Sequence, residues 1–288
     1  MVVRKRFIAS ALTIVVLAAV ALWYVLFANA NKAELDTRWA AHDTNSTLTV
    51  DHSTWQTLLD DYLVSDTDDG VNLFDYAGLI DDDRQPLDDY MALLEQTDPL
   101  ALNRAEQKAY WFNLYNAATV RLILDNYPLQ SITQLGSNPT EFGPWNEDAV
   151  VINGIDLSLN DVEHRIIRPL YNDYRIHFAV NCASIGCPNL AAEAFIADTL
   201  DEQLDTAANE YLTHPRGLEI QGSTLNLSTL FKWYADDFGA NQTEVLATLA
   251  KHTSEETQLA LSNFNGSPNY DYDWSLNGYC SVDDACGE

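Results

Sequence analysis

The pattern of apolar and polar positions divides the chain into an N-terminal apolar run and a long amphipathic remainder. Residues 7–27 are apolar except for Ser10 and Thr13, and about 20 such residues suffice for a helix to cross a membrane. A basic cluster at residues 4–6 precedes the run. This arrangement predicts an N-terminal apolar membrane helix, with the N-terminus in the cytoplasm and the remainder of the chain outside it.

Two fates of this segment remain open. Residues 28–30 have the small-x-small form of a signal-peptidase site, which would allow cleavage after Ala30. The apolar run is longer than the usual signal core, and Trp23 and Tyr24 suit an interfacial anchor. The sequence therefore predicts either an inner-membrane anchor with the domain in the periplasm, or a periplasmic or secreted protein.

Helical spacing dominates the rest of the chain. Residues 1–30 are expected to be the signal anchor or signal peptide, 31–50 a polar linker, 51–280 a single domain and 281–288 a tail. Apolar residues recur at i, i+3 and i+4, which predicts helices at 52–64, 86–96, 106–126, 158–168, 195–212 and, in short pieces, 228–262. The longest of these helices begins after Asn103, which with Glu106 resembles a capping box.

Strand signals are fewer. Residues 150–155 and 218–227 predict hairpins, and 176–182 alternates apolar and polar positions before a loop at 183–188. The expected fold is α+β: a mainly helical single domain with a small antiparallel sheet that carries His177.

The net charge of the chain limits the classes of molecule that it can bind. The chain has 43 acidic against 15 basic residues, a formal net charge of −28, and no acidic residue precedes Glu34. Such a surface repels phosphate backbones and anionic lipid, so nucleic acid is excluded and membrane contact is expected only through the N-terminal segment. A cationic ligand remains compatible with this charge.

The four cysteines lie late in the chain, at 182, 187, 280 and 286. An exported location permits disulfides, and four cysteines allow three connectivities. The pairs 182–187 and 280–286 are the simplest expectation. The Cys-x4-Cys spacing of the first pair also suits redox exchange, although it is not the Cys-x-x-Cys signature.

Catalytically useful side chains concentrate between residues 163 and 188. Cys182 is a plausible nucleophile, because a nearby imidazolium lowers a thiol pKa. On a regular strand His177 would lie on the opposite face from Cys182, so His164 is the better base, with Glu163 orienting it. A disulfide between Cys182 and Cys187 would remove the nucleophile.

Other chemistry has weaker signals. The acidic turn at 66–70 lacks the Gly and Glu positions of an EF-hand, and a zinc site from the two histidines and two cysteines matches no standard finger spacing. The chain has no Gly-x-Ser-x-Gly elbow, phosphate loop, dinucleotide fingerprint or His-Glu-x-x-His. We therefore expect neither a metal nor a cofactor.

Four segments carry a family resemblance. Residues 110–117 (YWFNLYNA), 157–164 (LSLNDVEH), 175–188 (RIHFAVNCASIGCP) and 272–277 (YDWSLN) resemble the signature segments of the domain of unknown function 547 family. Asn181 departs from the small or apolar residue that is more usual there. The resemblance implies a single-domain bacterial protein, often exported, whose signature segments meet at one place. It implies a shared site of Asn113, Asn116, Glu163, His164, His177 and Cys182.

Two functions follow as hypotheses. One is a non-catalytic envelope module that binds an unknown small molecule or envelope protein. The other is a cysteine-dependent hydrolase or acyltransferase using Cys182 with His164 or His177. Either way, the expected binding residues are Asn113, Asn116, Arg175, Asn181 and Ser184. Asn113 and Asn116 are open to a second interpretation, in which they are buried and bonded to a neighbouring loop.

Overall fold

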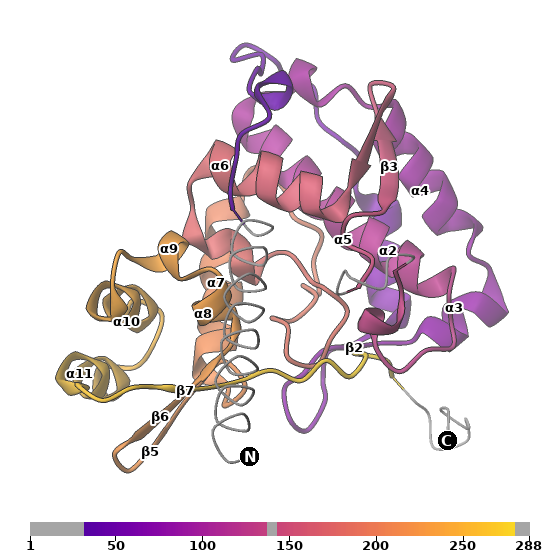
Figure 1. Cartoon of the computed structure of the whole chain (residues 1–288). Helices are drawn as coiled ribbons and strands as arrows, with labels where there is room; N and C mark the ends of the chain where they lie inside the picture. The colour runs from indigo at the N-terminus through magenta and orange to yellow at the C-terminus, as the bar shows by residue number, and fades with distance from the viewer. Residues whose placement is uncertain (1–31, 137–142, 280–288) are drawn as a thin grey trace, which may run out of the picture. The chain divides into compact units, whose positions relative to one another are not determined.

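The structure is a computed structural model that describes residues 32–136 and 143–279 (Figure 1). The predicted membrane segment, the cleavage site after Ala30, and Cys280 and Cys286 lie outside these residues. In the part of the chain that is described, no helix is both long and apolar enough to span a bilayer. From Glu34 onward the described residues form one compact unit.

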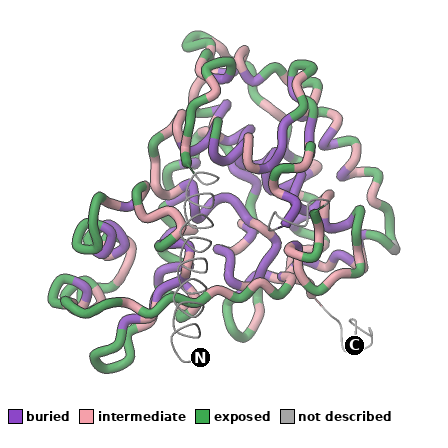
Figure 2. Tube along the Cα trace, viewed as in Figure 1, coloured by how far each residue is buried: buried purple, intermediate pink, exposed green. Residues whose placement is uncertain are grey.

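Four helices build the first half of this unit, and α5 is central to it. The predicted helices at 52–64, 86–96 and 106–126 are confirmed, while one short helix was not predicted. The helices are α2 (Ser53–Tyr62), α3 (Tyr76–Asp82), α4 (Gln85–Gln96) and α5 (Arg104–Leu124). Asn103 caps α5 by accepting from the N–H groups of Ala105 and Glu106. Most of α5 is buried on all sides (Figure 2), because other segments surround it.

Residues 34–50, within the polar linker expected at 31–50, belong to the compact unit. Trp39 ends the 3₁₀ turn η1 (Thr37–Trp39), is 1% exposed and packs edge-on against Trp111 of α5 at 5.4 Å between ring centroids. Glu106 does not complete the expected capping box, because its Oε1 accepts from Val50 N at 2.7 Å. The compact unit therefore begins at Glu34 rather than at residue 51.

Both predicted hairpins are confirmed. They are β3 (Asp148–Ile152) with β4 (Ile155–Ser158), and β5 (Leu218–Gln221) with β6 (Thr224–Ser228). The first turns at Asn153 and Gly154, both with positive φ, as a two-residue hairpin loop requires. The sheets are more varied than expected, because β7 (Asn269–Asp271) pairs parallel to β6 and β1 (Leu63–Val64) pairs with β2 (Leu73–Phe74). The mainly helical α+β class holds.

The predicted strand at 176–182 is wrong. This region follows a π-helix, η4 (Asp161–Ile167), and α6 (Arg168–Tyr171), and begins with a 3₁₀ helix, η5 (Tyr174–Phe178). Asp173 caps η5 by accepting from Arg175 N. Alternation of apolar and polar residues predicts a strand only where the polar side chains face water. Here the polar residues His177 and Asn181 are buried, so the pattern does not indicate a strand.

The C-terminal half builds a second hydrophobic cluster around Phe178, Tyr211, Phe231, Phe238 and Leu249. The predicted helices are confirmed as α7 (Leu200–Thr213), α8 (Leu230–Trp233), α9 (Ala235–Phe238), α10 (Gln242–Ala250) and α11 (Glu255–Asn263). After β7 the chain returns to the first half (Figure 1), where Tyr279 N donates to Phe74 O at 2.8 Å. This return places residues 272–277 beside the loop that carries Cys182.

Candidate functional site

Two free thiols form the centre of the candidate site. Cys182 and Cys187 lie at the two ends of one short loop, and their Sγ atoms are 2.8 Å apart without being bonded. Cys182 is half-buried, whereas Cys187 is buried and its Sγ accepts from Cys182 N at 3.0 Å. Cys182 is therefore the less buried of the two residues, and its sulfur lies directly against that of Cys187.

Asn181 closes this loop from the inside. Its Nδ2 donates to Pro188 O at 2.8 Å, and its Oδ1 accepts from Ala183 N at 2.8 Å. These bonds tie the residue before Cys182 to the residue after Cys187. Ala183 has a φ of 56°, an uncommon left-handed conformation for a residue with a side chain. The polar residue that departs from the family pattern is thus a structural clamp of the loop.

The C-terminal segment holds the loop from the other side. Ile185 N donates to Ser275 O and Gly186 N donates to Asp273 O, both at 2.8 Å. A Cβ on Gly186 would lie 2.8 Å from the backbone of Asp273, so only glycine permits this approach. The approach brings the hydroxyl of Tyr272 to 3.1 Å from Cys182 Sγ.

The polar contacts make the two thiols unequal. The hydrogen bond from Cys187 is the main cause that lowers the pKa of Cys182, and the Ser184 and Tyr272 hydroxyls add to it against the effects of burial and of the Glu163 charge. Burial and the neighbouring sulfur raise the pKa of Cys187 well above its usual value. Cys182 is therefore the thiol that ionises first, and Cys187 is the proton donor to it.

The two histidines belong to a separate buried cluster. His177 Nε2 donates to Asp237 Oδ2 at 2.6 Å, and Arg168 Nε donates to the same oxygen at 2.7 Å. His164 Nδ1 accepts from Arg168 Nη1 at 3.2 Å. Tyr234 stacks on His177 at 4.3 Å between ring centroids. Each imidazole is therefore engaged by charged groups of this cluster.

Glu163 joins the two histidines. Its Oε1 lies 3.6 Å from His164 Nδ1 and 3.9 Å from His177 Nδ1, and its Oε2 accepts from the hydroxyl of Tyr115 at 3.1 Å. Burial lowers the pKa of His164, which keeps this imidazole neutral and able to accept from Arg168. Asp237 has a lowered pKa, because its bonds from His177 and Arg168 outweigh the effect of burial.

No imidazole contacts the Cys182 sulfur. Within the described ranges its side-chain partners are Cys187, Ser184 and Tyr272. A cysteine hydrolase needs its base within hydrogen-bond reach of the nucleophile, so this geometry gives the hydrolase hypothesis no support. Nor do the residues of 32–136 and 143–279 contain a group of His, Cys, Asp and Glu side chains arranged to hold a metal ion.

The two helix asparagines are buried and bonded, as the second interpretation predicted. Asn113 Nδ2 donates to Phe195 O at 2.7 Å, and its Oδ1 accepts from Phe195 N at 3.0 Å. Asn116 bonds in the same two-sided way to Ala179 O and Asn181 N. Both amides join α5 to loops that carry no regular structure.

Arg175 lies in a different, more exposed cluster. Its guanidinium donates to the carboxylates of Asp173, Asp201 and Asp205 at 2.6 to 3.1 Å. Ser184, by contrast, lies at the thiols, with its Oγ 3.3 Å from Cys182 Sγ. The structure thus brings Asn116, Asn181, Cys182 and Ser184 together, and it places Arg175 apart from them.

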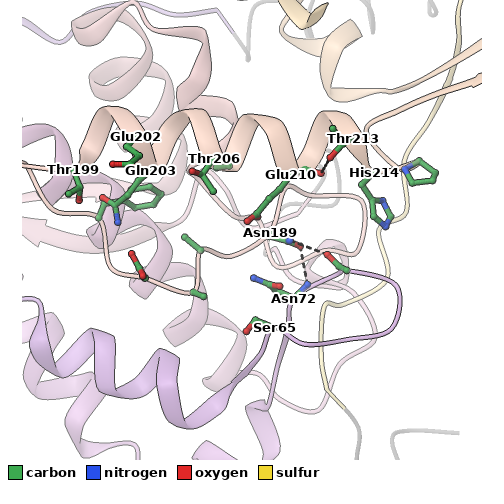
Figure 3. A pocket seen from close by; sticks show the side chains of 17 residues that line it. Ser65, Asn72, Asn189, Thr199, Glu202, Gln203, Thr206, Glu210, Thr213 and His214 are labelled. Carbon is green, nitrogen blue, oxygen red and sulfur yellow. Dashed lines mark hydrogen bonds between the residues drawn. The ribbon is translucent and has the colours of Figure 1, made fainter. Parts of the chain in front are cut away.

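A large groove lies beside α7 (Figure 3). Its volume is about 890 Å³, and it runs between α7, residues 189–195 and the loop at 65–72. Neither Cys182 nor the two histidines line it. This groove is therefore not lined by the expected site residues His164, His177 and Cys182.

Three contributing residues were missed. Tyr272, Asp237 and Tyr115 supply, respectively, a hydroxyl to Cys182, a carboxylate to His177 and a hydroxyl to Glu163. Tyr272 lies in the signature segment 272–277, so its position in the sequence was a usable signal. Asp237 lies in an acidic stretch, where nothing local distinguishes it from its neighbours.

Comparison with known proteins gives one match. Residues 99–212 match the model of a family described as "Protein of unknown function, DUF547". Comparison with curated proteins and with solved structures finds no match. The matched part is less than half of the chain, and it includes both thiols, Glu163 and the two histidines, but not Tyr272 or Asp237. The chain thus carries a DUF547 region at residues 99–212, with the Cys182–Cys187 loop inside it.

Proposed function

We propose that Cys182 and Cys187 form a redox-active dithiol that exchanges with disulfides of envelope proteins or small thiols. The observation that supports it is the 2.8 Å separation of two free sulfurs, one on the half-buried Cys182 and one on the buried Cys187. A thiol whose pKa is lowered, followed by a second thiol within reach, is the arrangement that thiol–disulfide exchange requires.

The reaction runs in two exchanges. The Cys182 thiolate attacks one sulfur of the substrate disulfide, forms a mixed disulfide, and releases the other substrate sulfur, which takes up a proton. Cys187 then loses its proton and attacks Cys182 Sγ, which forms the Cys182–Cys187 disulfide and releases the second substrate thiol. Two electrons pass to the substrate, and the reverse sequence oxidises a substrate dithiol.

The surrounding groups have positioning roles. The Tyr272 hydroxyl lies 3.1 Å from Cys182 Sγ and 3.1 Å from Ser184 Oγ. Burial raises the pKa of Tyr272 well above its usual value, so its hydroxyl stays protonated and can donate to the thiolate. Asn181 holds the loop ends together while the sulfurs change partner.

The proposal includes an envelope location. The basic residues 4–6 and the apolar run at 7–27 support export of the domain. An exported dithiol meets an oxidising compartment, where disulfide partners are present. The substrate class is then a disulfide-bearing envelope protein or a low-molecular-weight disulfide.

A redox titration tests the proposal. The full chain with Cys280→Ser and Cys286→Ser would be equilibrated in mixtures of reduced and oxidised glutathione, and the 182–187 disulfide quantified by peptide mapping. We expect a reversible two-electron transition. Persistence of two free thiols under fully oxidising conditions would overturn the proposal.

Trapping adds a matched control. Cys187→Ser should accumulate a mixed disulfide at Cys182, because the second exchange is blocked, whereas Cys182→Ser should form far less adduct because Cys187 is buried. Equal adduct formation by the two variants would contradict the assigned roles. An unchanged near-ultraviolet circular dichroism spectrum would show that each variant retains native packing.

A further inference from the structure

Arg216 lies against the loop that carries the two thiols. It follows α7 in the turn before β5. Its Nη1 donates to Ile185 O at 3.2 Å, and its Nη2 donates to Asn189 Oδ1. Ile185 lies between Cys182 and Cys187, and Asn189 follows Cys187 by two residues. The guanidinium therefore contacts the chain on both sides of Cys187 in the sequence.

This cation has no carboxylate partner. Among the described residues, no Asp or Glu forms an ion pair with Arg216, and its Nε is buried without an acceptor. The guanidinium instead lies over the ring of Tyr211, 5.6 Å from the centroid, and the Tyr211 hydroxyl donates to Gly186 O at 2.7 Å. Burying a cation costs free energy unless other groups compensate for its charge. Arg216 is thus a partly buried positive charge that the folded protein does not neutralise with a carboxylate.

The charges around the thiols act in opposite directions. Burial lowers the pKa of Arg216, and interactions with groups that include Cys187 raise it; arginine stays protonated in proteins, so its charge is permanent. Glu163 carries the opposing negative charge, which disfavours the Cys182 thiolate. Five tyrosines also interact with both thiols: Tyr76, Tyr115, Tyr211, Tyr234 and Tyr272. Burial raises the pKa of each tyrosine, so these hydroxyls stay uncharged. Of all these groups, only Arg216 favours a thiolate through its charge.

We propose that Arg216 is a positioning residue that stabilises the reduced dithiol in its thiolate form, and thereby raises the reduction potential of the Cys182–Cys187 pair. The negative charge exists only in the reduced form, because the disulfide is neutral, so a nearby fixed cation favours reduction. The bond to Ile185 O holds the guanidinium against the loop in which this charge appears. The inference rests on the proposed redox function, and it makes the disulfide a stronger oxidant of substrate dithiols.

The equilibrium with glutathione, measured at two pH values, tests this role. The full chain with Cys280→Ser and Cys286→Ser, in a non-ionic detergent, would be compared with the same chain carrying Arg216→Gln. The 182–187 disulfide would be quantified at a pH above the alkylation midpoint of Cys182 and at a pH well below it. At the higher pH we expect Arg216→Gln to favour the disulfide by about tenfold, which corresponds to about 30 mV. At the lower pH the effect should disappear, because both thiols are protonated.

Two variants separate charge from hydrogen bonding. Arg216→Lys keeps the charge but cannot keep both bonds of the guanidinium, so it should retain the parent's equilibrium constant. A shift in Arg216→Lys would overturn the proposal even if Arg216→Gln did not fold, which near-ultraviolet circular dichroism would reveal. The matched control is Arg38→Gln, which removes the same charge from an exposed position and should change nothing.

The remaining outcomes are distinct. An equal shift by Arg216→Gln at both pH values would show that the residue acts through loop geometry and not through its charge. An unchanged constant at the higher pH, in a chain that does form the 182–187 disulfide, would also refute the role of Arg216. Failure of the proposed redox function looks different, because then no variant would form that disulfide.

Discussion

The side-chain oxygen of Asn116 accepts a hydrogen bond from the backbone N–H of Asn181 at 2.9 Å. The same amide donates to Ala179 O, also at 2.9 Å. The segment from 179 to 181 has no regular secondary structure, so its buried backbone groups need partners from elsewhere. One side chain of α5 thus fixes the position from which Cys182 enters its loop.

Loss of this amide should destabilise the protein. Asn116→Ala leaves a buried N–H and a buried carbonyl without partners, at about 1–3 kcal/mol for each buried group. We expect the free energy of unfolding in urea to fall by about 2–6 kcal/mol. Asn126→Ala, at an exposed position, should change it by less than about 0.5 kcal/mol. Equal effects of the two substitutions would show that the Asn116 bonds contribute little.

The reactivity of Cys182 should depend on its donors. Because the pKa of Cys182 is lowered, the rate of alkylation by iodoacetamide should reach half its maximum below the ordinary thiol value of about 8.5. Cys187→Ala removes the main donor, and Tyr272→Phe removes another, so both should move the midpoint upward. An unchanged midpoint in both variants would refute the proposed donor roles.

His52 should make stability depend on pH. Burial lowers the pKa of His52 to about 4 from 6.5, so the folded state binds this proton more weakly than the unfolded state does. The contribution of His52 to the free energy of unfolding should therefore be fully present above about pH 6.5. It should fall as the pH drops toward 4, by at most about 3 kcal/mol. Burial lowers the pKa of His164 as well, so the free energy of unfolding of the whole protein should fall by more than the His52 contribution.

The variant His52→Gln isolates the contribution of this residue. Tyr90 OH lies 2.7 Å from His52 Nδ1, and glutamine offers an uncharged acceptor in place of the imidazole. The difference in unfolding free energy between the parent and the variant should shrink as pH falls from 6.5 to 4. Parallel stability curves over this range would exclude His52 as a titrating group.

Residues 34–50 should contribute to the stability of the folded unit. Trp39→Ala removes a side chain that is 1% exposed, and a change of this kind costs about 3–5 kcal/mol. A chain that starts at residue 51 would also leave Glu106 Oε1 without its donor, Val50 N. We expect chains that start at 51 to unfold at a clearly lower temperature than chains that start at 34. Equal melting temperatures would restore the linker interpretation.

Some elements of the fold could be predicted from the local sequence pattern. The start of α5 follows from Asn103, and the turn of the first hairpin follows from Asn153 and Gly154. These features depend on residues within a few positions of one another, so they can be predicted from the local sequence. The 3₁₀ helix at Tyr174–Phe178 was not accessible, because burial of His177 depends on Tyr234 and Asp237, about 60 residues away.

The features of the candidate site likewise include some that the sequence predicts and others that depend on the tertiary structure. By itself, the sequence determined that two thiols share one short loop, that the helix asparagines need partners, and that the chain is strongly acidic. Only the tertiary structure decided that Cys182 contacts Tyr272 rather than an imidazole, and that neither thiol lines the large groove. The physical reason is that a side chain's protonation and partners depend on groups that folding brings near it, as Tyr272 comes to Cys182 from 90 residues away.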